Sequence, residues 1–254
     1  MIGPEPDLNR QRLGQLVLDV WATRLVSEAP RTDEGGFQHD VSDKVNPGEL
    51  WDDTLFMAGL FLARHGQASG RKDLVDEAAW QFLVRTCYLS DPEAGLWFHG
   101  WTFAGRHSFA RARWARGNAW VTACILDLFE TGVLPASLQM SLQGVLTAQV
   151  QALLPLQTAS GAWRTLLDDP GSDEEISATA GFAYGLLKAA RQGIGGPDWA
   201  AAGWRGSGGA VGERGRSGLD GALQAQRRNG GGIRPDLAGR GQHADALVRR
   251  SGRT

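Results

Sequence analysis

Residues 95–131, GLWFHGWTFAGRHSFARARWARGNAWVTACILDLFET, join a glycine–aromatic loop to a helical pattern in one continuous stretch. The loop opens with Gly95-Leu96-Trp97, and a glycine, an aromatic residue and a polar side chain follow one another again at Gly36–His39 and Gly161–Arg164. Phe37 and Trp97 are 60 residues apart, and Trp97 and Trp163 are 66 apart. The spacing indicates an internal repeat of about 60 residues.

Helical periodicity dominates the sequence around these loops. It predicts helices at about 7–26, 49–65, 72–88, 117–131, 138–154 and 173–191. Extended alternation typical of strands is scarce, and several helices are apolar on more than one face, as expected for helices packed between two neighbours. In the first two repeats a second helix returns the chain. We therefore expect an all-α fold of three helical hairpins, which either extend as a solenoid or close as an α/α toroid.

The composition changes near residue 195. Residues 195–254 hold 16 of the 35 Gly and 10 of the 26 Lys and Arg, but 5 of the 28 acidic residues, and they contain no Phe or Tyr. Such a segment buries too little apolar surface to offset the entropy of ordering. We predict a helical domain over 1–194 and a disordered, low-complexity Gly/Arg-rich tail over 195–254. Without interleaved aromatic residues, the tail does not resemble an RNA-binding segment.

The overall composition excludes several classes of partner. The net charge of −2 gives no reason to expect nucleic acid or an anionic membrane, and no apolar run approaches the length of a membrane span. Cys87 and Cys124 fall in helical patterns and are interpreted as small core residues of a cytoplasmic protein in a reducing compartment. The five histidines show no helical metal-binding spacing, and no phosphate-binding loop or dinucleotide fingerprint is present. We therefore predict no metal and no cofactor.

Polar motifs open the helix that follows each repeat loop. In a toroid, loop residues and inner-helix starts would line one central cleft, although they are distant in sequence. The residues expected there share polar or aromatic side chains suited to sugar binding: His39, Asp53, His99, Trp101, Trp114, Arg116 and Asn118.

Two adjacent carboxylates, Asp52 and Asp53, begin one of these helices and admit two interpretations. Both could simply favour the helix dipole. Alternatively, one faces the cleft as a general acid whose pKa is raised by apolar neighbours such as Trp51, Phe56 and Met57.

Each of the other polar motifs also admits two interpretations. His99 could be a structural hydrogen-bonding residue or a substrate contact. Arg116 could satisfy helix-end carbonyls or bind a carboxylate bidentately, while Trp114 offers a flat face to a sugar. Glu174 and Glu175 could be a helix-start charge cluster or a second acidic element on the cleft rim.

Taken together, residues 51–57 (WDDTLFM), 95–101 (GLWFHGW) and 114–118 (WARGN) resemble glycoside hydrolase family 105, the unsaturated rhamnogalacturonyl hydrolases, which are related to the unsaturated glucuronyl hydrolases of family 88. The stretch from 161–164 (GAWR) to 175–180 (EISATA) is also similar, so the likeness covers about residues 30–193. The resemblance implies an (α/α)6 toroid that acts on oligosaccharides left by polysaccharide lyases, by hydrating the C4=C5 double bond of a terminal unsaturated uronate.

The resemblance also implies roles for individual residues. Asp53 matches the family's acid/base, which would protonate C4 and then deprotonate a water that adds at C5; the hemiketal opens and releases the next sugar. His99 matches a substrate-contacting histidine, Trp114 a stacking position and Arg116 the site arginine, which would meet the uronate carboxylate. Asn118 and His39 are carried over as further substrate-binding positions.

The chain departs from the family in its number of hairpins, because the toroid has six and the pattern supplies three. We expect about half a toroid from a truncated gene product, with the tail as an out-of-frame translation. Apolar helix faces left uncovered would favour self-association. A non-catalytic helical carbohydrate-binding or interaction module on the same scaffold is the alternative to an enzyme.

Overall fold

The computed structural model describes residues 8–41 and 44–211, and α-helices make up most of this part of the chain. The helices are α1 (Leu8–Glu28), α2 (Leu60–Ser69), α3 (Lys72–Leu89), α4 (Ala115–Thr131), α5 (Ala136–Leu153), α6 (Ile176–Arg191) and α7 (Pro197–Val211). A π-helix, η1 (Leu55–Gly59), leads into α2, and a 3-10 helix, η2 (Leu154–Leu156), follows α5. The predicted helical fold class is confirmed, and a helix lies within each of the six predicted ranges, but the prediction of helix from residue 49 was wrong, because residues 49–51 form a strand and helix begins at Leu55.

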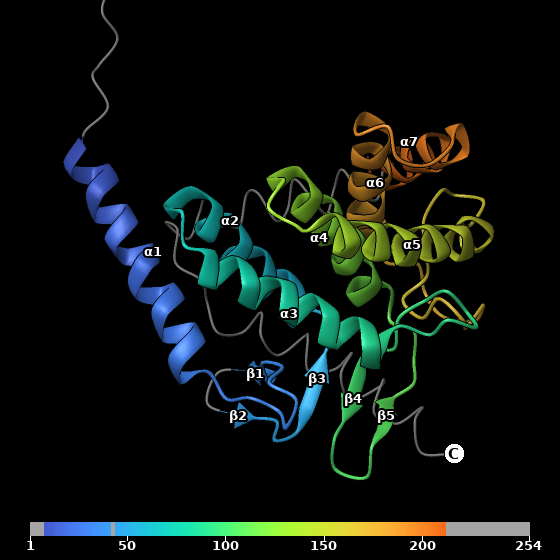
Figure 1. Cartoon of the computed structure of the whole chain (residues 1–254). Helices are drawn as coiled ribbons and strands as arrows, with labels where there is room; N and C mark the ends of the chain where they lie inside the picture. Colours follow the sequence, from blue (N-terminus) through green and yellow to red (C-terminus); the bar gives the residue numbers. More distant parts are fainter. Residues whose placement is uncertain (1–7, 42–43, 212–254) are drawn as a thin grey trace, which may run out of the picture.

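The helices form three successive hairpins, α2–α3, α4–α5 and α6–α7, preceded by α1 (Figure 1). Helix α4 is central, because it packs against α2, α5 and α6, while α1 packs against α2 and α3. This arrangement is the partial α/α toroid that the repeat predicts, with α2, α4 and α6 as the inner helices.

Small residues bring the inner helices close together. A Cβ atom on Gly185 of α6 would lie 2.7 Å from Thr122 Cγ2 of α4, and one on Gly181 would lie 3.0 Å from Ala119 Cβ. Helix α4 is buried along most of its length, as its apolar faces predict. Cys124 lies in this core, but Cys87 is exposed on α3, so its assignment to the core was wrong.

The aromatic residues of the three repeat loops are almost completely buried, as predicted. Each is also fixed through its backbone by a polar side chain of a helix. The N–H groups of Phe37, Trp97 and Trp163 donate to Gln81 Oε1, Asn118 Oδ1 and Thr179 Oγ1 at 2.9, 2.9 and 3.0 Å, respectively. The repeat is therefore an anchoring device that fixes each loop to the helices.

A small sheet accompanies the helices, which the sequence did not reveal. Strands β3 (Glu49–Trp51), β4 (Gly100–Thr102) and β5 (His107–Ala110) pair antiparallel in that order, and β1 (Asp40–Val41) pairs with β2 (Lys44–Val45). Strands of two to four residues are too short to show alternation. The sheet lies beside the lower ends of α2 and α3 in Figure 1, where β3 leads into η1.

Helix α7 lies within the predicted tail, so the prediction of disorder from residue 195 was wrong for Pro197–Val211. Trp199 and Ala202 are buried, and Gly203 and Gly206 face neighbouring side chains instead of solvent. Glycine here permits close helix packing, which composition averaged over 60 residues cannot distinguish from flexibility. Residues 212–254, the remainder of the predicted tail, lie outside the described residues.

The contact of α7 with α6 can be tested by a matched pair of glycine substitutions. A Cβ on Gly203 would lie 2.9 Å from Leu187 Cγ, whereas one on Gly208 would meet nothing within 4 Å. We expect Gly203→Ala to lower the free energy of unfolding by about 1–2 kcal/mol. Gly208→Ala should raise it by roughly 0.5–1 kcal/mol, because alanine favours the helix. Urea denaturation of both variants measures the difference, and equal effects would contradict the α6–α7 packing.

Candidate active site

Four rings line up where the repeat loops meet the starts of the inner helices. His39 stacks on Trp51 with centroids 4.4 Å apart and planes 13° from parallel. The ring centroids of Trp51 and His99 are 4.8 Å apart, and those of His99 and Trp114 are 4.6 Å apart. We call these four residues the aromatic row. It joins three of the predicted site residues, His39, His99 and Trp114, through Trp51.

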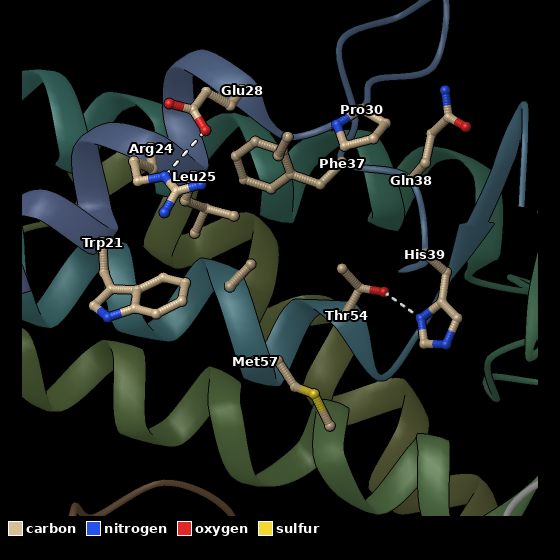
Figure 2. A pocket seen from close by; sticks show the side chains of 12 residues that line it. Trp21, Arg24, Leu25, Glu28, Pro30, Phe37, Gln38, His39, Thr54 and Met57 are labelled. Carbon is tan, nitrogen blue, oxygen red and sulfur yellow. Dashed lines mark hydrogen bonds and ion pairs between the residues drawn. The ribbon is translucent and has the colours of Figure 1, made fainter. Parts of the chain in front are cut away.

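Asp53 lies at the His39 end of the aromatic row. It stands in the turn between β3 and η1, where its carbonyl accepts the N–H groups of Phe56 and Met57 at 3.1 and 3.4 Å. Its side chain is 16% exposed, with Oδ1 3.5 Å from His39 Nδ1. His39 Nδ1 also lies 3.0 Å from Thr54 Oγ1 (Figure 2). Asp53 is therefore a carboxylate beside an imidazole, within reach of solvent.

Asp52 points in a different direction from Asp53 and is completely buried. His99 Nδ1 lies 2.8 Å from Asp52 Oδ1, and the Asp52 N–H donates to the His99 carbonyl at 3.2 Å. Burial is the main cause that raises the pKa of Asp52 to about 6, although His99 opposes the shift. Of the adjacent pair, Asp52 is thus the carboxyl placed in an apolar, aromatic surrounding.

Two residues that the sequence analysis did not select affect the surroundings of Asp52. Gly117, in the first turn of α4, leaves the space for the carboxylate, since a Cβ there would lie 1.9 Å from Asp52 Oδ2. Arg85 of α3 is fully buried and donates to the carbonyls of Trp51 and Phe37 at 3.2 and 2.8 Å. Burial lowers the pKa of Arg85 to about 10, while the charges of Asp53 and Asp52 act in the opposite direction.

Arg116 and Glu175 lie at the Trp114 end of the aromatic row. The Arg116 guanidinium is 5.0 Å from the Trp114 ring centroid, and its Nε donates to Glu175 Oε1 at 2.6 Å and Ser177 Oγ at 3.1 Å. Neither terminal nitrogen of Arg116 has a hydrogen-bond partner among the described residues. Of the two glutamates, Glu175 therefore pairs with Arg116, while Glu174 accepts a hydrogen bond from Ser160.

Trp101 does not join the aromatic row. Its strand partner is Leu50, and its ring packs against Tyr88 of α3 at 5.2 Å. Side chains alternate along a strand, so Trp101 lies on the face of the sheet opposite to Trp51. The structure thus places Trp101 away from the aromatic row, which the sequence analysis did not foresee because it did not recognise three-residue strands.

Asn118 is also a structural residue, in place of the substrate contact predicted for it. It is fully buried, and its amide nitrogen donates to the carbonyls of Trp97 and Trp114 at 3.0 Å each. Its Oδ1 accepts from the Trp97 N–H and from Gln149. The amide is thus fully used in holding the second repeat loop to α4.

A groove of about 410 Å³ opens between α1 and η1 and reaches the aromatic row at His39, beside Thr54. Figure 2 shows Trp21 of α1 and Met57 of η1 on its walls, with Phe37 and Gln38 along the loop. Trp21 and Met57 are 61% and 65% exposed. Periodicity placed Trp21 on a helix face but gave no sign that this face borders the site.

The signals for the missed residues are weak in sequence. Arg85 lies one turn after Gln81 on the buried face of α3, and a charge at such a position indicates a buried partner, but not which one. Within the described part of the chain, no group of three His, Cys, Asp or Glu residues is placed to hold a metal ion. In the same part, none of the helices has the length and apolar content to cross a bilayer.

A family model described as Glycosyl Hydrolase Family 88 matches residues 10–229 of the chain. The chain is 35% identical over 172 residues to the unsaturated rhamnogalacturonyl hydrolase YesR of Bacillus subtilis (strain 168). The aligned region covers 67% of this chain and 50% of the relative.

Solved structures agree with the family model. The structure of a possible GH105 family member from Salmonella enterica serovar Paratyphi A superposes with a TM-score of 0.77 at 46% identity, covering 80% of this chain and 54% of that one. The unsaturated glucuronyl hydrolase of Bacillus sp. GL1 shares the fold at a TM-score of 0.60 and 19% identity, over 82% of this chain and 56% of that one.

The chain thus spans about half the length of these relatives. The matched segment contains the loops, the inner-helix starts and the aromatic row described above. The family model matches most of the length of this chain, which is also similar to a possible GH105 member. The chain therefore belongs to Glycosyl Hydrolase Family 88.

Proposed function

We propose that the chain carries the catalytic part of the active site of a hydrolase. Its substrates would be the unsaturated uronyl oligosaccharides that pectin and rhamnogalacturonan breakdown produces. The observation that carries this proposal is the partly exposed Asp53 at one end of the aromatic row, with Arg116 at the other. The B. subtilis relative is named an unsaturated rhamnogalacturonyl hydrolase, and that name supports the substrate class.

Asp53 supplies the proton chemistry in this proposal. Its carboxyl protonates C4 of the double bond, and the carboxylate left behind takes a proton from the water that adds at C5. The hydrated uronate is a hemiketal, which opens and releases the neighbouring sugar. One group acts in turn as acid and base, so the site needs no second carboxylate at a fixed separation.

Arg116 and Trp114 bind the sugar in this proposal. Because Glu175 holds Nε of Arg116, the two terminal nitrogens remain to donate to the uronate carboxylate or a hydroxyl. Trp114 is 5% exposed, so the stacking face that it would offer is confined to the edge of the row. Glu175 also offsets part of the Arg116 charge, so the attraction to an anionic sugar is local and short-ranged.

The proposal predicts that Asp53→Asn abolishes turnover. We expect kcat to fall by about 10³-fold or more, because the amide can neither donate nor accept the proton. Loss of the ultraviolet absorbance of an unsaturated rhamnogalacturonan disaccharide measures the rate. Asp76→Asn, on the exposed face of α3, is the matched control and should keep the wild-type rate. Equal rates for the wild type and Asp53→Asn would remove Asp53 from the mechanism, and binding without turnover in the wild type would favour the non-catalytic module.

Arg116→Gln should weaken substrate binding more than it slows the reaction. Loss of a charge-assisted hydrogen bond costs about 1.5–3 kcal/mol, which corresponds to a roughly 10- to 100-fold rise in KM. Arg191→Gln, at the exposed end of α6, serves as the charge-matched control. A KM that is unchanged in Arg116→Gln would show that the arginine only ties α4 to Glu175.

The two cysteines support a further proposal, that the protein acts in the cytoplasm. Both are free thiols, one exposed at Cys87 and one buried at Cys124, and exposed free thiols are typical of reducing compartments.

We also propose that two copies associate through α1. Its exposed apolar residues, Leu13, Leu16, Val17, Val20 and Trp21, recur at helical spacing and form one stripe. Such a stripe favours contact with a second helix.

Light scattering coupled to size exclusion should show a dimer or larger species for the wild type at micromolar concentration. Leu16→Glu with Val20→Glu should give a monomer, because two charges would be buried in the contact. Met140→Glu, on the exposed face of α5, is the control and should leave the oligomer intact. A monomeric wild type would contradict the association.

A further inference from the structure

Hydrogen bonds of both its backbone and its ring join His99 to Asp52. The Asp52 N–H donates to the His99 carbonyl at 3.2 Å, and the His99 ring meets Asp52 Oδ1 through Nδ1 at 2.8 Å. The His99 N–H also donates to the Ala112 carbonyl at 3.3 Å. Backbone and side chain of His99 are therefore both fixed by the β3–β4 region and the segment before α4.

The rings around His99 leave it one orientation. Trp51 lies 4.8 Å away at 77° and Trp114 lies 4.6 Å away at 72°, so two indoles border the imidazole nearly edge to face. His99 and Asp52 are 1% and 0% exposed. A flip of the ring would take Nδ1 from the buried carboxylate and leave that carboxylate without its hydrogen bond, at a cost that burial makes large.

We propose that Asp52 is a positioning residue that fixes His99 in the tautomer with the hydrogen on Nδ1, so that Nε2 carries the lone pair. An ionised carboxylate only accepts hydrogen bonds, which requires the ring nitrogen facing it to be the donor. For activity, this inference rests on the function proposed above: His99 would present Nε2 as an acceptor toward a sugar hydroxyl, and Asp52 would act only through His99.

The charges around Asp52 fit this role. His99 lowers the pKa of Asp52 and the charge of Asp53 raises it, while Arg85 of α3 and Cys124 of α4 each interact electrostatically with the Asp52 carboxylate. Gly117 places the carboxylate against the first turn of α4, where the helix dipole favours a negative charge. With its pKa at about 6, Asp52 is ionised above neutral pH.

Nitrogen-15 NMR of the histidine rings tests the proposal without substrate. At about pH 8 the wild type should show His99 with a hydrogen on Nδ1 and none on Nε2, the resonance being assigned by its loss in His99→Gln. Asp52→Asn should shift His99 away from this single tautomer, and it should raise KM by about 2- to 10-fold, because the ring no longer presents an acceptor to the sugar hydroxyl. Asp53→Asn is the matched control, which should lose activity but keep the His99 signature.

Each outcome decides one question. A hydrogen on Nε2 in the wild type, or a wild-type signature in Asp52→Asn, would overturn the inference. Full activity of Asp53→Asn with the expected His99 tautomer would overturn the proposed function alone. Far-ultraviolet circular dichroism checks the fold of Asp52→Asn, and if that variant does not fold, the wild-type spectrum still decides the tautomer.

Discussion

The site depends on a carboxylate buried where strand, loop and helix meet. Folding raises the pKa of Asp52 from 3.8 to about 6, so the folded state holds this proton more tightly than the unfolded chain. The contribution of Asp52 to the free energy of unfolding is therefore greatest below about pH 4. It declines by roughly 3 kcal/mol in all as the pH rises through 6. The hydrogen bond from His99 and the start of α4 reduce this cost without removing it. Under the proposal above, this buried charge fixes the orientation of His99 within the aromatic row.

Small residues make that burial possible. Without the hydrogen side chain of Gly117, the Asp52 carboxylate and the first turn of α4 could not occupy the same region. Gly181 and Gly185 similarly bring α6 against α4, and that contact brings Glu175 within 2.6 Å of Arg116. Close helix packing and site geometry are thus one constraint, because a wider spacing of α4 and α6 would separate the arginine from its partner.

The sequence predicted the helices and the aromatic loops well because both repeat at fixed intervals. Phe37, Trp97 and Trp163 are buried as their recurrence indicated. Trp101 and Asn118 were misplaced because their roles depend on strand pairing and on a side-chain amide, neither of which leaves a periodic trace. Helix α7 was missed for the opposite reason, since glycine at a helix contact has the same composition as glycine in a flexible segment. Asp52 and Asp53 are neighbours in sequence, and only the backbone turn after β3 separates their environments.

The turn after β3 directs Asp53 away from Asp52, so the two ends of the aromatic row carry opposite charges. Asp53 lies near His39 and Thr54 at one end of the aromatic row, and Arg116 lies over Trp114 at the other. A carboxylate-bearing sugar would be attracted by the terminal nitrogens of Arg116. Under the proposed function, C4 and C5 of the sugar lie nearest to Asp53, and Arg116 binds the carboxylate on C5 or a hydroxyl from the opposite side of the sugar. The groove between α1 and η1 begins at the His39 end of the row, so it opens next to the carboxyl that the proposal makes the proton donor.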